Sequence, residues 1–275
     1  MKLFKILFIL FLLGLNSTNA QISLGDRALG ALQNGVKGFM FSDEDAAALS
    51  KEAVAKMDKE NLVATTKDPY TIRLNKVFGK HINENGLVLN FKVYKVKDVN
   101  AFACADGSVR VFAGLMDIMD DNELLAVIGH EIGHVANHDS RDAAKAAYKK
   151  AALIDAVSSQ SDKIAAVTDG QLGQIANALM DNKHSRTQES DADAFSYDFM
   201  KKHGYNVNAV ESAFNILASM SEGKDSSFIE KMMSSHPDSK ERAATAKAHA
   251  ESDGLYKPYI KASKVQTKVA SKKKK

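Results

Sequence analysis

Two histidines and a glutamate stand close together in the segment His130-Glu131-Ile132-Gly133-His134. If this segment is helical, His130 and His134 lie four residues apart on one face, so both imidazoles can reach a single ion. Zinc binds histidine nitrogens at about 2.0–2.1 Å. Glu131 lies too far around the helix to be a good third ligand, but it can contact a water on the metal. The spacing therefore predicts two zinc ligands and a general base.

The flanking residues predict the helix that this arrangement needs. Asp120, with Glu123 three residues later, is typical of a capping box at a helix start. An apolar stripe at helical spacing follows it: Leu124, Ile128, Ile132 and Val135. Unpaired histidines are costly to bury in such a context. The pattern therefore favours a metal site over two surface histidines.

The third ligand has to come from another part of the chain. The metzincin pattern requires glycine at 137 and histidine at 140, but the chain has Asn137 and Ser140, which excludes it. His138 stays on the side of the helix that carries His134, and we expect it at the surface or in an outer, supporting position.

Glu189 is the best candidate for that ligand. Ser185 and Gln188 predict a capped helix start just before it, and Gly204 is a natural stop at the other end. Asp193, four residues after Glu189, lies on the same helical face. We expect Glu189 to bind the metal and Asp193 to accept the free ring N–H of a zinc-bound histidine.

The remaining elements predict a mostly helical α+β fold with a small three-stranded antiparallel sheet packed on the histidine-bearing helix. The predicted helices cover 21–63, Tyr70 to His81, a helix from Asp120 whose apolar stripe runs to Val135, parts of 140–182, 185–204 and Ala209 to Ser221, with a mobile segment around 158–170. The predicted strands are Leu87 to Tyr94, Ala101 to Cys104 and Val109 to Phe112, with Asp106-Gly107 favouring a hairpin between the last two. We expect the 109–112 strand to lie beside the cleft and pair with a substrate backbone.

The N-terminus resembles a secretory signal peptide over residues 1–20. Lys2 and Lys5 precede a short apolar run, and Thr18-Asn19-Ala20 offers a cleavage point before Gln21. The alternative is an uncleaved anchor, although ten residues span only roughly 15 Å of a bilayer core of roughly 30 Å. No cysteine follows the run, so a lipoprotein signal is not expected. We therefore expect an exported, periplasmic protein with a helical segment at 21–65, a catalytic domain at 66–255 and a tail at 256–275.

Charge is distributed unevenly along the chain. Without the two lysines of residues 1–20 and the eight of residues 256–275, the net charge of +3 becomes −7. A mildly acidic body is unlike a nucleic-acid-binding surface, so no nucleic-acid partner is expected. We expect a disordered lysine-rich tail, with weak peripheral contact with anionic lipid or polymer as the alternative. The single cysteine, Cys104, excludes an intrachain disulfide.

The motifs together resemble the gluzincin peptidases of the Oma-type and HtpX-like group, peptidase family M forty-eight, and within it the YggG/LoiP-type exported metallopeptidases of Gram-negative envelopes. The resemblance covers roughly residues 66–245. The residues that carry it are Asp98 to Ala103, Val127 to His134, Ser185-Arg186 with Glu189 to Asp193, Ser235-His236-Pro237 and Glu241-Arg242.

The resemblance implies one zinc ion held by His130, His134 and Glu189, with Glu131 as catalytic base. It also implies that Asp193 is an acidic residue sometimes assigned as proton donor and that His236 stabilises the tetrahedral intermediate. The implied activity is hydrolysis of unfolded or misassembled envelope proteins. Two alternatives stay open: a zinc-containing holdase that binds without cutting, and an assembly factor that binds a partner through residues 21–63. A closed resting state, with the stretch after Ser140 or with His236 blocking the metal, is a further expectation.

Overall fold

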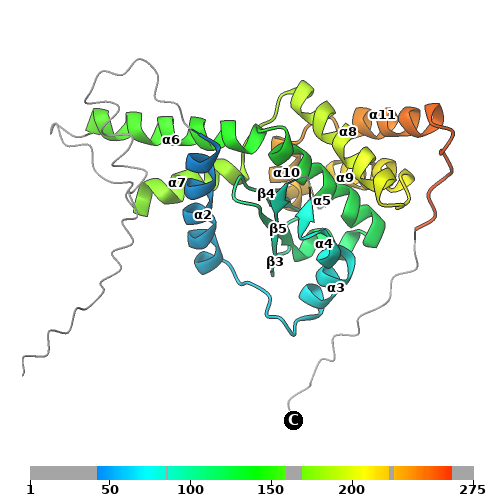
Figure 1. The fold of residues 1–275 in the computed structure, drawn as a ribbon, viewed down its shortest axis with the longest axis horizontal. Helices are drawn as coiled ribbons and strands as arrows, with labels where there is room; N and C mark the ends of the chain where they lie inside the picture. Colours follow the sequence, from blue (N-terminus) through cyan, green and yellow to red (C-terminus); the bar gives the residue numbers. More distant parts are fainter. Residues whose placement is uncertain (1–41, 85, 159–168, 223–225, 262–275) are drawn as a thin grey trace, which may run out of the picture.

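The computed structural model describes residues 42–84, 86–158, 169–222 and 226–261 (Figure 1). The predicted signal peptide, residues 21–41 of the predicted N-terminal helix, most of the predicted mobile segment around 158–170 and the tail from residue 262 lie outside these residues. Of the helices in the described part, none is long and apolar enough to cross a membrane.

Helices make up most of the described chain, as the sequence predicts. The α-helices are α2 (Asp43–Glu60), α3 (Pro69–Phe78), α4 (Ala113–Ile118), α5 (Asp121–Ala136), α6 (Asp139–Ser158), α7 (Asp169–Met180), α8 (Arg186–Lys202), α9 (Asn208–Ser221), α10 (Glu230–Ser235) and α11 (Ser239–Ser252). Two 3-10 turns are η1 (Gly79–His81) and η2 (Ser226–Phe228). The strands are β1 (Asn83–Glu84), β2 (Leu87–Val88), β3 (Asn90–Tyr94), β4 (Ala101–Ala103) and β5 (Ser108–Phe112).

The three-stranded sheet is mixed, so the prediction of a purely antiparallel sheet is wrong. The β4–β5 hairpin is antiparallel, and Gly107 makes its turn with a φ of 81°, as the Asp-Gly pair predicts. β5 then inserts between β4 and β3 and runs parallel to β3, giving the order β3-β5-β4. Every residue of β5 is buried, which is typical of a central strand and not of an edge.

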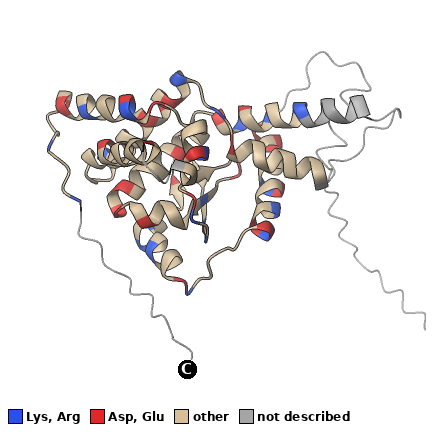
Figure 2. Ribbon diagram, turned by 180° about the vertical axis from the view of Figure 1, so that it is seen from behind, with Lys and Arg blue, Asp and Glu red and all other residues tan. Residues whose placement is uncertain are grey.

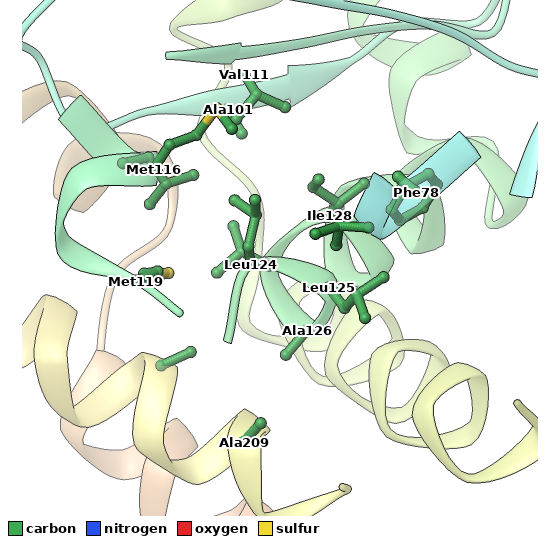
Figure 3. Packing of buried hydrophobic residues seen from close by; sticks show 14 of the residues in the cluster. Phe78, Ala101, Val111, Met116, Met119, Leu124, Leu125, Ala126, Ile128 and Ala209 are labelled. Atoms are coloured by element: carbon green, nitrogen blue, oxygen red, sulfur yellow. The ribbon is translucent and has the colours of Figure 1, made fainter. Parts of the chain in front are cut away.

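The sheet is covered by helices on both faces. Figure 3 shows α5 between the sheet residues Ala101 and Val111 on one side and Ala209 of α9 on the other, with Leu124 and Ile128 of the predicted stripe buried in this core. The opposite face of the sheet packs against α2, α6 and α7 in a second cluster that includes Phe102 and Phe112. α5 is therefore held between two layers, which fixes the position of its histidines.

A buried ion pair fastens α2 to the central strand. Arg110 of β5 is 2% exposed, and its Nε and a terminal nitrogen lie 2.8 and 3.0 Å from the two carboxylate oxygens of Asp58. Burial alone raises the pKa of Asp58, but hydrogen bonds from Arg110, Lys92 and Tyr94 outweigh it and lower the pKa to about 2. Asp58 therefore stays ionised across the neutral range and holds α2 on the sheet.

The segment after α11 returns to the start of α5. The Tyr259 hydroxyl donates to the Asp120 carboxylate, and the Lys261 ammonium lies 2.8 Å from Oε2 of Glu123. Asp120 and Glu123 form the capping box predicted for α5. The first part of the expected tail is thus packed against the start of α5.

Figure 2 shows acidic and basic residues interspersed along the same helices, α2 and α11 among them.

Candidate metal centre

Two glycines let α5 and α8 approach closely at the histidine motif. A Cβ on Gly133 would lie 3.0 Å from the Cα of Ala192 and 3.0 Å from the Cβ of Phe195. A Cβ on Gly129, one turn earlier, would lie 3.1 Å from the ring of Phe199. Since these distances are shorter than ordinary carbon contacts, a side chain at either position would require its neighbours on α8 to shift by a few tenths of an ångström. The crossing sets the predicted ligands of the two helices opposite each other.

His130, His134 and Glu189 converge as the sequence predicts. The two histidine Nε2 atoms are 3.0 Å apart. Glu189 places Oε1 3.3 Å from Nε2 of His134 and Oε2 3.6 Å from Nε2 of His130. All three side chains are buried. A zinc ion with donors at about 2.0–2.1 Å holds its ligand atoms roughly 3.4 Å apart, so this donor set fits zinc after small shifts.

Each histidine has a carboxylate behind its ring. Nδ1 of His130 lies 2.8 Å from Asp193, the contact that the spacing of α8 predicts. Nδ1 of His134 lies 2.8 Å from Asp139. A carboxylate on Nδ1 holds the ring in the tautomer whose Nε2 is free to bind a metal. Both imidazoles are therefore fixed for metal binding.

Asp139 is a site residue that sequence reasoning missed. It follows the C-terminus of α5, and His138 between them adopts a left-handed backbone with a φ of 67°. This turn directs the Asp139 carboxylate back to His134, while the exposed His138 ring faces Asp43. Gln188 of the α8 capping box also donates to Asp139 at 2.8 Å. The only signal for Asp139 in the sequence is its place just after the end of α5. Its spacing from His134 does not by itself show that the two side chains meet.

Arg242 of α11 ties the carboxylates of the site together. Its guanidinium makes a two-point contact with Asp193 at 2.8 and 2.6 Å and pairs with Oε2 of Glu189. The ring of Phe214 packs against the guanidinium, whose central carbon lies 4.1 Å from the ring centroid. This pairing leaves Oε1 of Glu189 directed at the imidazoles. Arg242 falls in the Glu241-Arg242 pair of the resemblance, but sequence reasoning assigned it no role.

His236 also reaches the cluster. Its Nδ1 lies 3.2 Å from Nε2 of His130 and 3.0 Å from Oε1 of Glu189. The ring of His184, which we did not predict, stacks on His134 with centroids 3.7 Å apart. Together with Glu131 and Ala101 to Ala103 of β4, these two histidines line a small pocket. His236 therefore stands where it can act as a fourth donor.

The charges of the site depend on burial and on the surrounding histidines. Burial raises the pKa of Glu189, but bonds with His134 and His236 outweigh it and hold the pKa far below its ordinary value. Burial lowers the pKa of His134, yet bonds with Asp139 and Glu189 raise it to about 9. The cluster thus combines an ionised carboxylate with a protonated His134 ring, and a bound cation would take the place of that proton.

The surroundings of Glu131 differ from those of the three predicted metal ligands. Burial raises its pKa, and its Oε1 has no hydrogen-bond partner among the described residues. The nearest nitrogen to this oxygen in an ion-pair geometry is Nε2 of His236, at 3.6 Å. An orphaned buried oxygen next to a metal donor set fits a water molecule between them. The residues therefore accommodate both a zinc ion and its water.

Comparison with known proteins assigns the chain to a family. The model of "Peptidase family M48" matches residues 74–250. The chain belongs to peptidase family M48. Metalloprotease YcaL of Escherichia coli (strain K12) is 42% identical over 229 residues, covering 82% of this chain and 85% of the relative. Metalloprotease LoiP of the same organism is 37% identical over 232 residues, covering 82% and 90%.

Membership of family M48 agrees with the geometry of the site. The matched residues include all three members of the His130, His134 and Glu189 cluster. Protease HtpX of Xanthomonas euvesicatoria pv. vesicatoria (strain 85-10) is 33% identical over a shorter stretch of 96 residues, which covers 33% of each chain. The chain is a metalloprotease of this family, with a His/His/Glu cluster of the kind that binds zinc.

Proposed function

We propose that the chain is a zinc-dependent endopeptidase that is exported and cleaves unfolded or misassembled proteins of the cell envelope. The observation that carries this proposal is the convergence of His130, His134 and Glu189 beside the buried carboxyl of Glu131. Two imidazoles and one carboxylate leave a further position for water or substrate, which is the arrangement of catalytic zinc sites.

The chemistry follows from the positions of the side chains. Zinc bound to these three residues would supply the Lewis acid that polarises the scissile carbonyl and acidifies a water molecule. Glu131 takes the proton from the attacking water and delivers it to the leaving amine, and the rise in its pKa on burial makes the carboxylate a stronger proton acceptor. Asp193 and Asp139 hold the rings of His130 and His134 during these steps.

We assign His236 two positions in the reaction cycle. In the observed position its ring fills the space beside His130 and Glu189, which supports the expected closed resting state. When substrate displaces the ring, His236 remains near the tetrahedral centre and can donate a hydrogen bond to it. His236 belongs to the C-terminal end of α10 and precedes Pro237 and the left-handed Asp238, so a short segment carries this movement.

The substrate-binding strand differs from the one we expected. β5 (residues 108–112) is central and pairs with β3 and β4, so it cannot also pair with a substrate. Of the two edge strands, β3 and β4, it is β4 whose residues Ala101 to Ala103 line the pocket with Glu131. An extended substrate added to β4 would be recognised through its main chain, which favours unfolded chains over particular sequences. It would compete with the Ser140 hydroxyl, which donates to the Ala103 carbonyl at 3.1 Å.

The periplasmic location rests on the sequence of residues 1–20, and contact of the lysine tail with anionic surfaces rests on residues 256–275. The named metalloproteases of Escherichia coli cover most of the chain and support an enzymatic role. The holdase alternative lacks a use for the orphaned carboxyl of Glu131. The assembly-factor alternative needs α2, which already packs against α6 and α7.

Chelation tests the proposal. Purified protein, with and without a zinc chelator, is incubated with casein, and both cleavage and binding of unfolded casein are measured. The proposal predicts that chelation abolishes cleavage, that added zinc restores it, and that binding of casein persists. Binding without cleavage under every metal condition would support the holdase instead. A matched pull-down with residues 21–63 alone would support the assembly factor if it captured a partner as well as the full chain does.

A further inference from the structure

A second group of metal-binding side chains lies at the other end of α8 from Glu189. It comprises His81 at the end of η1, Glu84 of β1 and His203, which caps the C-terminus of α8. Oε2 of Glu84 is 3.0 Å from Nε2 of His203 and 3.6 Å from Nδ1 of His81. One ligand atom from each residue lies within 4.8 Å of the others. Donor atoms around a zinc ion are roughly 3.4 Å apart, so small movements of these three side chains would bring their ligand atoms to zinc-binding distances.

The ring of His81 is held with its Nδ1 toward this group. Its Nε2 lies 2.6 Å from the hydroxyl of Tyr205. If Nε2 carries the proton and donates to that hydroxyl, Nδ1 presents a lone pair to an ion, as in histidine ligands supported by an outer hydrogen bond. The ring also packs against both Phe78 and Phe199, with centroids 5.1 and 4.9 Å away. His81 is therefore oriented without help from an ion.

The two oxygens of Glu84 face different partners. Oε1 pairs with the ammonium of Lys202 at 2.7 Å, while Oε2 faces both imidazoles. The side chains of His81 and Glu84 are 2% and 5% exposed, whereas that of His203 is 25% exposed. The group thus has a buried floor and one side open to solvent, through which an ion and a water ligand can enter.

We propose that His81, Glu84 and His203 form a second zinc site, separate from the catalytic one. Two neutral imidazoles and a carboxylate suit a borderline divalent ion such as zinc, and poorly suit calcium or magnesium, which require oxygen ligands. On binding, the ion replaces the hydrogen bond between His203 and Glu84 and releases any proton shared by the group. It cross-links the turn after α3 to the C-terminal end of α8.

The role of this ion is structural. α8 carries Glu189 and Asp193 near its N-terminal end, and His203 ends the same helix. The site offers no free carboxyl comparable to Glu131, because both oxygens of Glu84 have partners. An ion here therefore fastens the helix that supplies the third catalytic ligand and does not itself support hydrolysis.

The test counts zinc per chain. Full-length protein is stripped with a chelator, reloaded with Zn²⁺, freed of excess metal on a desalting column and analysed by mass spectrometry of the metal. We compare the wild type with His203→Ala and His203→Gln, and with His249→Ala as control, since His249 is also a partly exposed helix histidine that stacks on a tyrosine. Circular dichroism verifies that each variant is folded.

The expected difference between wild type and either His203 variant is one zinc ion per chain, while His249→Ala retains the wild-type count. Zn²⁺ should also raise the melting temperature of the stripped wild type more than that of the His203 variants. If the catalytic site bound no zinc but the second site did, the wild type would hold one zinc ion per chain and the His203 variants none. The difference of one ion would therefore persist. Equal counts in wild type and both folded His203 variants would overturn the second site and leave a hydrogen-bonded network in its place.

Discussion

Replacing Asp139 by asparagine tests whether the residue behind His134 contributes to the metal centre. In the native site one carboxylate oxygen lies 2.8 Å from Nδ1 of His134 and the other accepts from Gln188. Asparagine keeps the size of the side chain but offers a single oxygen. One of the two donors must therefore face an amide NH₂ group, and the negative charge behind the imidazole is lost.

The magnitude follows from the burial of this contact. The Asp139 side chain is 8% exposed, so water cannot readily replace the lost hydrogen bond. Loss of an outer carboxylate partner costs about 10–100-fold in metal affinity, or about 1.4–2.7 kcal/mol of binding free energy. We expect Asp139→Asn to weaken zinc binding within that range and to lower activity at limiting zinc, with partial recovery when zinc is in excess.

Competition with a chromogenic chelator measures this change in the dissociation constant of zinc. Asp142→Asn is the control, because Asp142 lies on the same helix but its side chain is 59% exposed and pairs with Arg141. The His203→Ala background removes the contribution of the second site. An affinity of Asp139→Asn within twofold of the parent protein, or an equal loss in Asp142→Asn, would refute the role assigned to Asp139.

Three further predictions follow from the packing and charge of the fold. Gly133→Ala should cost about 1–3 kcal/mol of unfolding free energy and weaken zinc binding, because its Cβ would push against Ala192 and Phe195 of α8. Denaturant unfolding and zinc titration measure the two effects. A variant with unchanged stability and zinc affinity would contradict the close crossing of α5 and α8. Arg110→Met should cost about 3 kcal/mol by leaving Asp58 without its main buried partner, which chemical denaturation detects. The difference in unfolding free energy between the wild type and Asp58→Asn should be at its full size above about pH 4. It should shrink as the pH falls toward about 2, because the folded pKa of Asp58 is lowered to about 2. A difference that does not change with pH would contradict this.

Local signals in the sequence predicted the histidine-bearing helix and the ligand helix well. The capping boxes of Asp120 with Glu123 and of Ser185 with Gln188 begin α5 and α8 as expected. The four-residue spacing of the histidines also placed both rings together. These features depend on interactions within one helical turn, so the sequence determines them without knowledge of the rest of the fold.

Features that depend on long-range contacts escaped the sequence. The β3–β5 pairing is parallel because β5 inserts beside β3, and the short strands carry no signal for that order. Asp139 reaches His134 only because His138 takes a left-handed conformation, which is uncommon outside glycine. His81, Glu84 and His203 come from three elements, and no motif joins them.

The most direct measurement of the central claim pairs zinc content with casein cleavage in the wild type and in Glu131→Gln. Glutamine preserves the size of the side chain and removes its ability to accept the proton, while His130, His134 and Glu189 remain intact. We predict unchanged zinc content and a loss of cleavage of about 10²–10⁴-fold, the range expected when a general base is removed. A zinc-loaded Glu131→Gln variant that cleaves casein at the wild-type rate would contradict the assignment of Glu131 and the mechanism built on it.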